Sequence, residues 1–155
     1  MTPRILAVNP GSTSTKIAVF AGDAPVFVET IRHDAMELAS FGSVMDQEAY
    51  RRDLILAALQ RHGIAVADLA AVIGRGGLMR PIAGGTYAVN DAMLDDLRSC
   101  RFGTHASNLG AILARDLAGE AGIPALIADP VVVDELGPLA RYSGHPDISR
   151  RSIFH

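Results

Sequence analysis

The stretch Asn9-Pro10-Gly11-Ser12-Thr13-Ser14-Thr15-Lys16 decides the fold, because it places a turn between two short apolar runs. Residues 4–8 and 16–20 are partly β-branched, which predicts an antiparallel pair of β-strands. The turn carries four consecutive hydroxyl side chains and ends at the only lysine of a chain that has thirteen arginines. A compact ammonium, hydroxyls and free backbone amides are groups that bind phosphate oxygens. The sequence therefore predicts a phosphate-binding β-hairpin.

A P-loop is excluded, because the order of the residues is wrong for one. A P-loop needs a lysine followed by serine or threonine at the start of a helix, whereas Thr15 precedes Lys16 and residues 17–20 are strand-like. Serine and threonine are also common in turns that bind no ligand. The presence of Asn9 and Lys16 beside the hydroxyls favours phosphate binding over a plain turn.

The remaining elements follow from the spacing of apolar residues. Residues 26–31 supply a third strand after a turn at Gly22, so the chain opens as a three-stranded antiparallel meander. Further along, the sequence predicts a helix over 47–62 that stops at Gly63, a strand over 70–73, helices over 90–99 and about 106–120, and a strand over 124–128. Helices that appear only after the meander predict an α/β fold with a mixed sheet.

Composition and charge narrow the class of protein. The chain has 155 residues, is 49% apolar and carries a net charge of −3, which is typical of one globular domain. Its arginines are scattered, so no basic patch for nucleic acid is evident. The single cysteine, Cys100, cannot form an internal disulfide, and the apolar residues 5–8 are too few for a signal peptide or a membrane span. These features predict a cytoplasmic protein that binds neither nucleic acid nor membrane.

Three further residues stand at the ends of predicted elements, where functional side chains often lie. Arg75 lies in Gly74-Arg75-Gly76-Gly77, a loop with so little side-chain bulk that a ligand could approach the backbone. His105 precedes a helix, where an imidazole and free amides can meet an anion. Asp129 follows a strand, and a carboxylate there could orient Mg²⁺. The structural alternatives are a surface charge for Arg75 and a helix cap for His105.

The other histidines carry no such pattern. His33, His62 and His145 do not combine with Cys100 into the spacing of a metal site. His62 is explained by the dipole at the end of its helix. All three are interpreted as structural or surface residues.

Taken together, the motifs resemble the acetate and butyrate kinase family, whose domains have a ribonuclease H-like (actin-like ATPase) fold. The resemblance begins with residues 9–16 and runs over nearly the whole chain. Segments 74–77, 81–87, 104–110 and 129–135 resemble butyrate kinases more closely than acetate kinases. Members of this family hold two such domains, with the active site between them. The resemblance implies that residues 1–155 are the N-terminal domain, without the second domain that binds most of the adenosine.

The resemblance also implies roles for individual residues. It implies ATP and Mg²⁺ as cofactors, a short-chain carboxylate as substrate, and a homo-oligomer for the full-length protein. Because acetate kinases carry bulkier residues after the matching arginine, two glycines here imply room for a longer acyl chain. The implied residues are catalytic Arg75, His105, Asp129 and His155, phosphate-binding Asn9, Gly11, Ser12, Ser14 and Lys16, a substrate pocket at Gly76, Gly77 and Phe154, and Mg²⁺ ligands Asn9 and Asp129.

Several functional alternatives stay open at this point. A sugar kinase of the same superfamily is disfavoured, because it would carry an aspartate where Asn9 stands. A non-enzymatic phosphate-binding domain gains support from the short chain. A kinase for acetate, propionate or a branched-chain acid differs from a butyrate kinase only in the acyl group of its substrate. Residues 138–155 show no regular period and stop inside a motif of the family, which predicts that the chain is a fragment.

Overall fold

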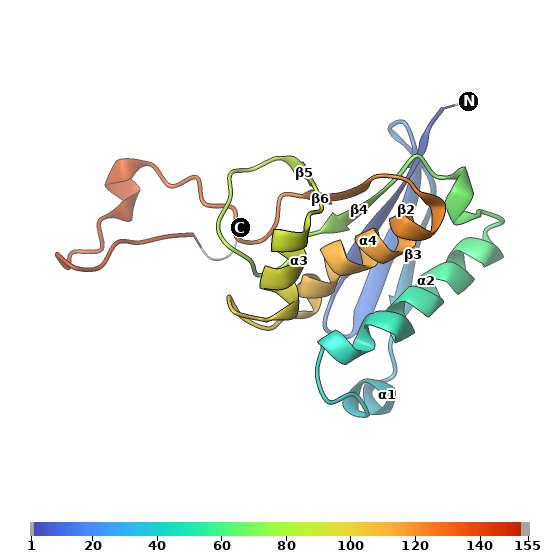
Figure 1. The fold of residues 1–155 in the computed structure, drawn as a ribbon, viewed down its shortest axis with the longest axis horizontal. Helices are drawn as coiled ribbons and strands as arrows, with labels where there is room; N and C mark the ends of the chain where they lie inside the picture. Colours follow the sequence, from blue (N-terminus) through green and yellow to red (C-terminus); the bar gives the residue numbers. More distant parts are fainter. Residues whose placement is uncertain (1, 153–155) are drawn as a thin grey trace.

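The computed structural model describes residues 2–152, which form a six-stranded sheet covered by helices (Figure 1). The strands are β1 (Arg4–Pro10), β2 (Ser14–Ala21), β3 (Ala24–Arg32), β4 (Ala71–Arg75), β5 (Thr86–Ala88) and β6 (Ala125–Ala128). The α-helices are α1 (Ala35–Ala39), α2 (Glu48–Arg61), α3 (Asp91–Arg98) and α4 (Leu109–Ala121). Short 3₁₀ turns cover Met45–Gln47, Val66–Asp68, Ala106–Asn108 and Pro138–Arg141.

The sheet is mixed, with the strand order β3-β2-β1-β4-β6-β5. Strands β1, β2 and β3 pair antiparallel, so the predicted meander is confirmed. Strand β4 pairs parallel with β1, and β6 pairs parallel with β4, whereas β5 returns antiparallel along β6. The carboxyl ends of β1, β4 and β6 therefore meet at one edge of the sheet.

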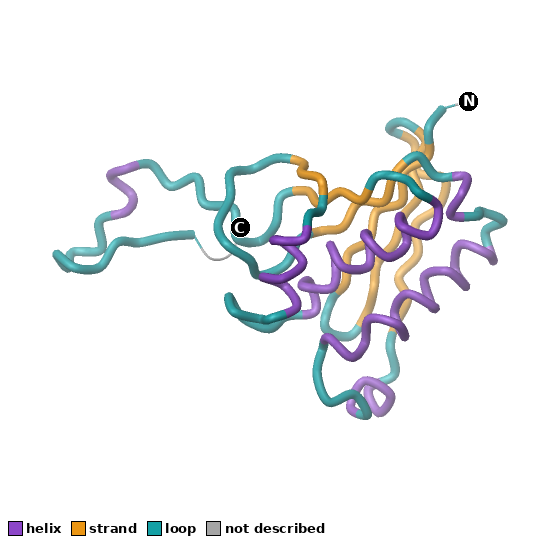
Figure 2. Tube along the Cα trace, viewed as in Figure 1, coloured by secondary structure: helices purple, strands orange, loops and turns teal. Residues whose placement is uncertain are grey.

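The helices α2 and α4 lie on one face of the sheet, and α3 packs beside α4 (Figure 2). Helix α4 packs on β1, β4 and β6, and α2 packs on β3 and α4. Side chains alternate accordingly, because successive residues of a strand point to opposite faces. On β1, Leu6 and Val8 are buried against the helices, whereas Ile5 and Asn9 are exposed on the other face. The apolar core thus fills the space between the sheet and the helices α2 and α4.

The ends of the helices follow the expected local signals. Helix α2 ends at Arg61 with His62 as its C-cap, and Gly63 adopts a left-handed φ of 66°. Helix α4 ends at Ala121, and its C-cap Gly122 has a left-handed φ of 65°. At the start of α3 the Asn90 side chain accepts a hydrogen bond from the Met93 amide at 3.0 Å. None of these helices is long and apolar enough to cross a bilayer.

Helix α1 and strand β5 are not predicted by the sequence. Helix α1 is capped by Asp34, which accepts hydrogen bonds from Met36 and Glu37, but none of its residues is buried. Helix α1 therefore lacks the regular spacing of buried apolar residues by which a helix is predicted from sequence. Strand β5 has only three residues, and it is defined by pairing with β6, which lies about forty positions later in the chain. Periodicity cannot reveal a strand that short.

Beyond β6 the chain leaves the body of the domain. Residues 134–152 extend as an arm away from the sheet (Figure 1). Within the arm, Tyr142 and Ser149 form an isolated antiparallel bridge, and Arg141 pairs with Asp134 at 3.0 Å. The arm is thus held by local contacts more than by the core.

A very close backbone contact joins strand β4 to helix α4. A Cβ atom on Gly74 would collide with the Gly110 carbonyl oxygen, and one on Gly110 would collide with the Arg75 carbonyl oxygen. Neither collision can be relieved by a rotamer change, because both partners are backbone atoms. Glycine at both positions lets the first turn of α4 lie directly against the end of β4.

Replacement of Gly110 by alanine tests this contact. We expect Gly110→Ala to lower the free energy of unfolding by about 1–3 kcal/mol, the usual cost of overpacking a rigid interior. Urea unfolding followed by circular dichroism measures it. A methyl group on Gly119, in the same helix, would meet no atom within 4 Å. Gly119→Ala should instead stabilise the protein by about 0.5–1 kcal/mol. Equal effects of the two changes would contradict the close contact.

Candidate functional site

A cavity of about 560 Å³ lies at the edge where the parallel strands end. Its polar lining consists of four residues that the sequence singles out, Asn9, Lys16, Arg75 and Asp129. The rest of the lining is mostly apolar and comes from mid-strand positions, including Ala7, Ala18, Phe20, Val28 and Ile73. Ligands of open α/β sheets commonly bind at the carboxyl ends of strands. The structure thus brings together side chains from β1, β2, β4 and the end of β6 in one cavity.

The hairpin between β1 and β2 supplies two of these side chains. Asn9 and Lys16 are direct cross-strand partners, and both are exposed on the face without helices. The turn between them is closed by a hydrogen bond of 2.7 Å from the Gly11 amide to the Ser14 carbonyl. Ser12 and Thr13 lie at its exposed tip. The hairpin therefore presents an ammonium and an amide to the cavity, whereas Gly11, Ser12 and Ser14 are not among the residues that line it, and their role in binding phosphate stays a prediction.

Arg75 is the last residue of β4, and its side chain is exposed at the same edge. The two glycines that follow it are buried. A Cβ atom on Gly76 would collide with Pro130 and Ile127, and one on Gly77 would collide with the backbone of Asn108. Close packing therefore requires glycine at both positions, and neither glycine is among the residues that line the cavity. A substrate pocket at Gly76 and Gly77 stays a prediction.

Asp129 sits in a strained backbone conformation at the end of β6. Its φ of 37° lies in the left-handed region, which aspartate tolerates better than most residues. Its Oδ1 accepts a hydrogen bond of 2.7 Å from the Gly85 amide, and Oε1 of Glu135 accepts one of 2.8 Å from the Gly84 amide. These bonds fix the carboxylate of Asp129 while it lines the cavity.

His105 caps the 3₁₀ turn that leads into α4. Its Nδ1 lies 3.2 Å from the Ser107 amide, which donates to it, and 2.9 Å from the Ser107 hydroxyl. Because Nδ1 accepts from the backbone, a neutral His105 carries its proton on Nε2. The side chain is exposed and is not part of the cavity lining. In this structure its contacts are those of a helix cap, and a catalytic role stays a prediction.

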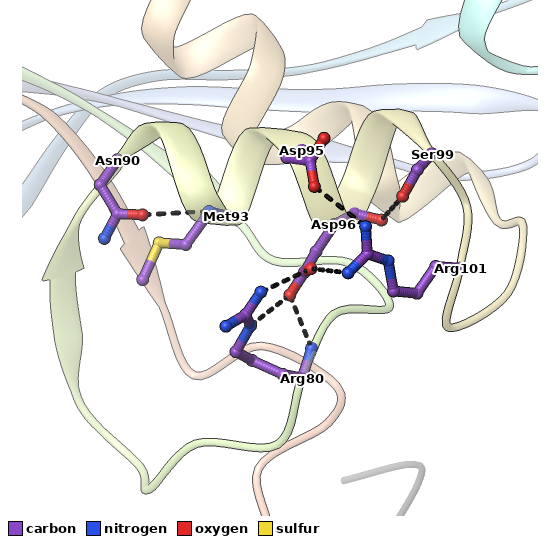
Figure 3. A network of polar contacts seen from close by, with 7 residues as sticks. All are labelled: Arg80, Asn90, Met93, Asp95, Asp96, Ser99 and Arg101. Carbon is purple, nitrogen blue, oxygen red and sulfur yellow. Dashed lines mark hydrogen bonds and ion pairs between the residues drawn. The ribbon is translucent and has the colours of Figure 1, made fainter.

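A buried carboxylate organises the loop that follows Arg75 (Figure 3). Asp96 of α3 is fully buried and accepts hydrogen bonds from Arg80 through its backbone amide, Nε and a terminal nitrogen, at 3.3, 2.6 and 2.8 Å. Arg101 approaches the same carboxylate at 3.8 Å. The Arg80 hydrogen bonds hold the pKa of Asp96 below its usual value, despite burial. This network anchors residues 76–85 to α3.

A second anchor comes from Asn108, which is also fully buried. Its Oδ1 accepts a hydrogen bond of 2.9 Å from the Leu78 amide, and its Nδ2 donates to the Gly103 carbonyl at 3.0 Å. Asn108 and Asp96 are residues of this region that the sequence does not identify. Their partners Leu78 and Arg80 lie 30 and 16 positions away, and no local pattern marks such distant pairs.

The remaining charged and aromatic candidates have structural contacts. The His62 ring stacks on Phe27 with centroids 3.9 Å apart, and its Nε2 lies 3.0 Å from Glu29. Asp134, at the start of the arm, is paired with Arg141. Within residues 2–152, no three His, Cys, Asp or Glu side chains are grouped as metal ligands. Phe154 and His155, both predicted site residues, lie outside the described residues.

Comparison with solved structures identifies the fold. Acetate kinase from Porphyromonas gingivalis matches 93% of this chain and 41% of its own chain, with a TM-score of 0.62 and 12% identity. Acetate kinase from Entamoeba histolytica matches 93% of this chain and 39% of its own, with a TM-score of 0.54 and 17% identity. No protein-family model matches the sequence.

This similarity confirms the predicted fold class. The chain has the ribonuclease H-like fold of the actin-like ATPases, with a mixed sheet that opens as an antiparallel meander. It spans about two fifths of the length of the kinases that it matches. At such low identity the similarity concerns the fold alone.

The buried network in Figure 3 gives a test with a matched pair of variants. We expect Asp96→Asn to lower the free energy of unfolding by about 1–3 kcal/mol near neutral pH, because buried donors lose a charged acceptor. Asp95→Asn, one residue away and exposed, should change it by less than about 0.5 kcal/mol. Urea unfolding of both variants and the parent measures the difference.

The pH dependence of the same measurement has a definite sign. The folded-state pKa of Asp96 is lowered, so its stabilisation is present above the unfolded value of about 3.9 and is lost as the pH falls through the folded value. The gap between the parent and Asp96→Asn should therefore shrink below about pH 4. A gap that stays constant down to about pH 2 would show that Asp96 is not stabilised as a carboxylate.

Proposed function

We propose that this chain is the phosphate-binding domain of a carboxylate kinase, which transfers the γ-phosphoryl group of ATP to butyrate or a related short-chain acid. One observation carries the proposal, namely that Asn9, Lys16, Arg75 and Asp129 line a single cavity at the carboxyl ends of the parallel strands. The four residues come from three separate parts of the sequence, namely the first hairpin, the end of β4 and the end of β6. Their convergence is what a site for a phosphorylated ligand requires.

The proposed reaction needs charge and position more than a base. The attacking atom is an oxygen of a carboxylate, which is already ionised at neutral pH. It forms a bond to the γ-phosphorus while the bond from that phosphorus to the bridging oxygen breaks, and ADP leaves with the electron pair. Catalysis of such transfers rests on alignment and on cations around the phosphoryl group. Lys16 and Arg75 supply two cations from different strands of the same cavity.

The donor set also fits Mg²⁺. This ion is usually held by one or two carboxylates together with substrate phosphates and water. Asp129 provides a carboxylate and Asn9 an amide oxygen in the same cavity. Mg²⁺, when bound, neutralises charge on the transferring phosphates. The hydrogen bond from the Gly85 amide holds Asp129 in place for this role.

We further propose that a second domain completes the site. The kinases that match this chain extend well beyond the matched part. The polar side chains of the cavity are exposed here, so one wall of a closed active site is not provided by residues 2–152. Adenosine contacts and the exclusion of water would come from that second domain, and the reaction would take place in the cytoplasm.

The same exposure favours one other function, a free-standing domain that binds phosphate without catalysis. The DNA sequence of the gene after codon 155 distinguishes the kinase from the free-standing binding domain. A reading frame that continues past codon 155 into a second domain supports the kinase, whereas a stop codon at that point supports the binding domain.

A kinase assay tests the proposed reaction. We expect a protein extended by its natural C-terminal sequence to form butyryl hydroxamate from butyrate, MgATP and hydroxylamine. Arg75→Ala should lower kcat by about 10²-fold or more, because one cation that stabilises the transferring group is lost. Arg61→Ala removes an exposed arginine paired with Glu29 and should leave kcat unchanged. The 155-residue chain alone should show no turnover, since it cannot exclude water.

The outcomes of this assay are separable. An Arg75→Ala protein with the parent kcat would remove Arg75 from the mechanism but leave the activity. An extended protein that folds and makes no acyl phosphate with any short-chain acid would overturn the proposed function. Steady turnover by the purified 155-residue chain would instead remove the need for a second domain.

The acyl preference is a separate prediction. We expect kcat/KM to be roughly 15-fold higher for butyrate than for acetate, because two further buried methylenes contribute about 0.8 kcal/mol each. Acetate, propionate, butyrate and isobutyrate, each assayed with the extended protein, give the comparison. Gly77→Val is not a useful variant here, because its side chain would collide with Asn108. Equal values across the series would show that the protein does not select acyl length.

A further inference from the structure

The hydroxyl-rich turn rests on one buried arginine from helix α2. Arg51 is fully buried, and its guanidinium donates to the Gly11 carbonyl at 2.9 Å, the Ser14 carbonyl at 3.3 Å and the Thr15 hydroxyl at 3.0 Å. A longer contact of 3.5 Å reaches the Ser12 carbonyl. The opposite side of the guanidinium is held by Oε1 of Gln47 at 2.8 and 3.1 Å. Helix α2 and the turn are thus joined through a single side chain.

These contacts determine which way the amides of the turn point. In a planar trans peptide the carbonyl and the following N–H point in opposite directions. Since the Gly11 and Ser12 carbonyls face Arg51, the N–H groups of Ser12 and Thr13 face away from it. Ser12 and Thr13 are exposed, and neither N–H donates to an acceptor within residues 2–152. Successive free amides of this kind form an anion-binding concavity.

The charge of Arg51 is not neutralised by its surroundings. Its partners in the described chain are carbonyl, hydroxyl and amide oxygens, and no carboxylate is among them. The neighbouring His33 adds no charge, because burial and Arg51 lower its pKa to about 4. Leaving a buried guanidinium without an anion is costly. A phosphate at the tip of the turn would gain from that uncompensated positive charge.

We propose that Arg51 is a positioning residue, which holds the turn so that the amides of Ser12 and Thr13 receive a phosphoryl group. Arg51 itself does not touch the ligand. The proposal rests on the proposed function only in its phosphate site at this hairpin. A purely structural role, in which Arg51 merely attaches α2 to the sheet, would leave phosphate affinity and the amide signals unchanged in a folded variant.

Nuclear magnetic resonance of the unmutated 155-residue chain tests the geometry directly. Inorganic phosphate is titrated against a control of sodium chloride at matched ionic strength. We expect phosphate, and not chloride, to shift the amide resonances of Ser12 and Thr13 in a saturable manner, because their N–H groups donate to it. Saturable phosphate shifts elsewhere, with these two amides unmoved, would overturn the proposal.

Arg51→Lys then tests the side chain. Lysine keeps the charge but cannot span the Gln47 and turn oxygens together. We expect phosphate to bind at least tenfold more weakly, with the Ser12 and Thr13 shifts reduced. Arg52→Lys, on the adjacent residue of the same helix, is the matched control and should bind phosphate as the parent does, since Arg52 pairs with Asp53 at the surface. Parent-like affinity in folded Arg51→Lys would overturn the positioning role.

A second variant covers the case in which Arg51→Lys does not fold. Thr15→Val removes one acceptor of Arg51 while nearly preserving side-chain shape. We expect a smaller loss of affinity, about threefold, and a shift of the Ser12 and Thr13 amide resonances in the free protein. If Thr15→Val changes neither the phosphate affinity nor the amide resonances, the proposal is contradicted.

Failure of the proposed function has a different signature. If the parent binds phosphate at these amides but the extended protein phosphorylates no acid, the kinase is wrong and the role of Arg51 stands. If the parent binds no phosphate at the Ser12 and Thr13 amides, the role of Arg51 is wrong, and the kinase is then judged by the activity of the extended protein. If binding and kinase activity are present and Arg51→Lys preserves both, only the role of Arg51 is wrong.

Discussion

The backbone contact between Gly74 and Gly110 is the constraint on which the site depends. With no side chain between them, the start of α4 lies against the carboxyl end of β4, beside Arg75. This approach brings Asn108 under the glycine loop, where it binds the Leu78 amide. A larger residue at either glycine would push the helix outward. The position of α4 at the edge of the sheet that holds the cavity therefore requires glycine at both Gly74 and Gly110.

Two buried charges extend from the helices to the site loops, and their surroundings differ. Asp96 of α3 is paired with guanidinium groups, so its charge is balanced and its network mainly fixes a loop. Arg51 of α2 is surrounded by neutral oxygens, so its positive charge is retained beneath the hairpin. Burial of an unbalanced charge opposes folding. Its presence under a turn with free amides is better explained by binding than by stability.

Much of the fold, but less of the site, could be predicted from the sequence. The meander, the helices after it and their glycine ends follow from local periodicity and capping, and the structure confirms them. Asn9, Lys16, Arg75 and Asp129 are recognisable from turn chemistry, strand ends and family resemblance, and they share one cavity. Arg51 and Asp96 could not be recognised, because their partners lie far away along the chain. A charged residue inside a helix looks the same in sequence whether it is buried or solvated.

The exposure of the cavity to solvent determines how strongly its two cations can attract an anion. Lys16 and Arg75 are exposed on the face of the sheet that carries no helix in the described chain. Between charges about 4 Å apart the attraction is about 1 kcal/mol in water and about 4 kcal/mol at the lower effective dielectric near a protein surface. Two cations in an open cavity therefore attract an anion only weakly. In the proposed kinase, a cover over this face would strengthen the same contacts without moving any residue, so the strength of catalysis would depend on what closes the cavity.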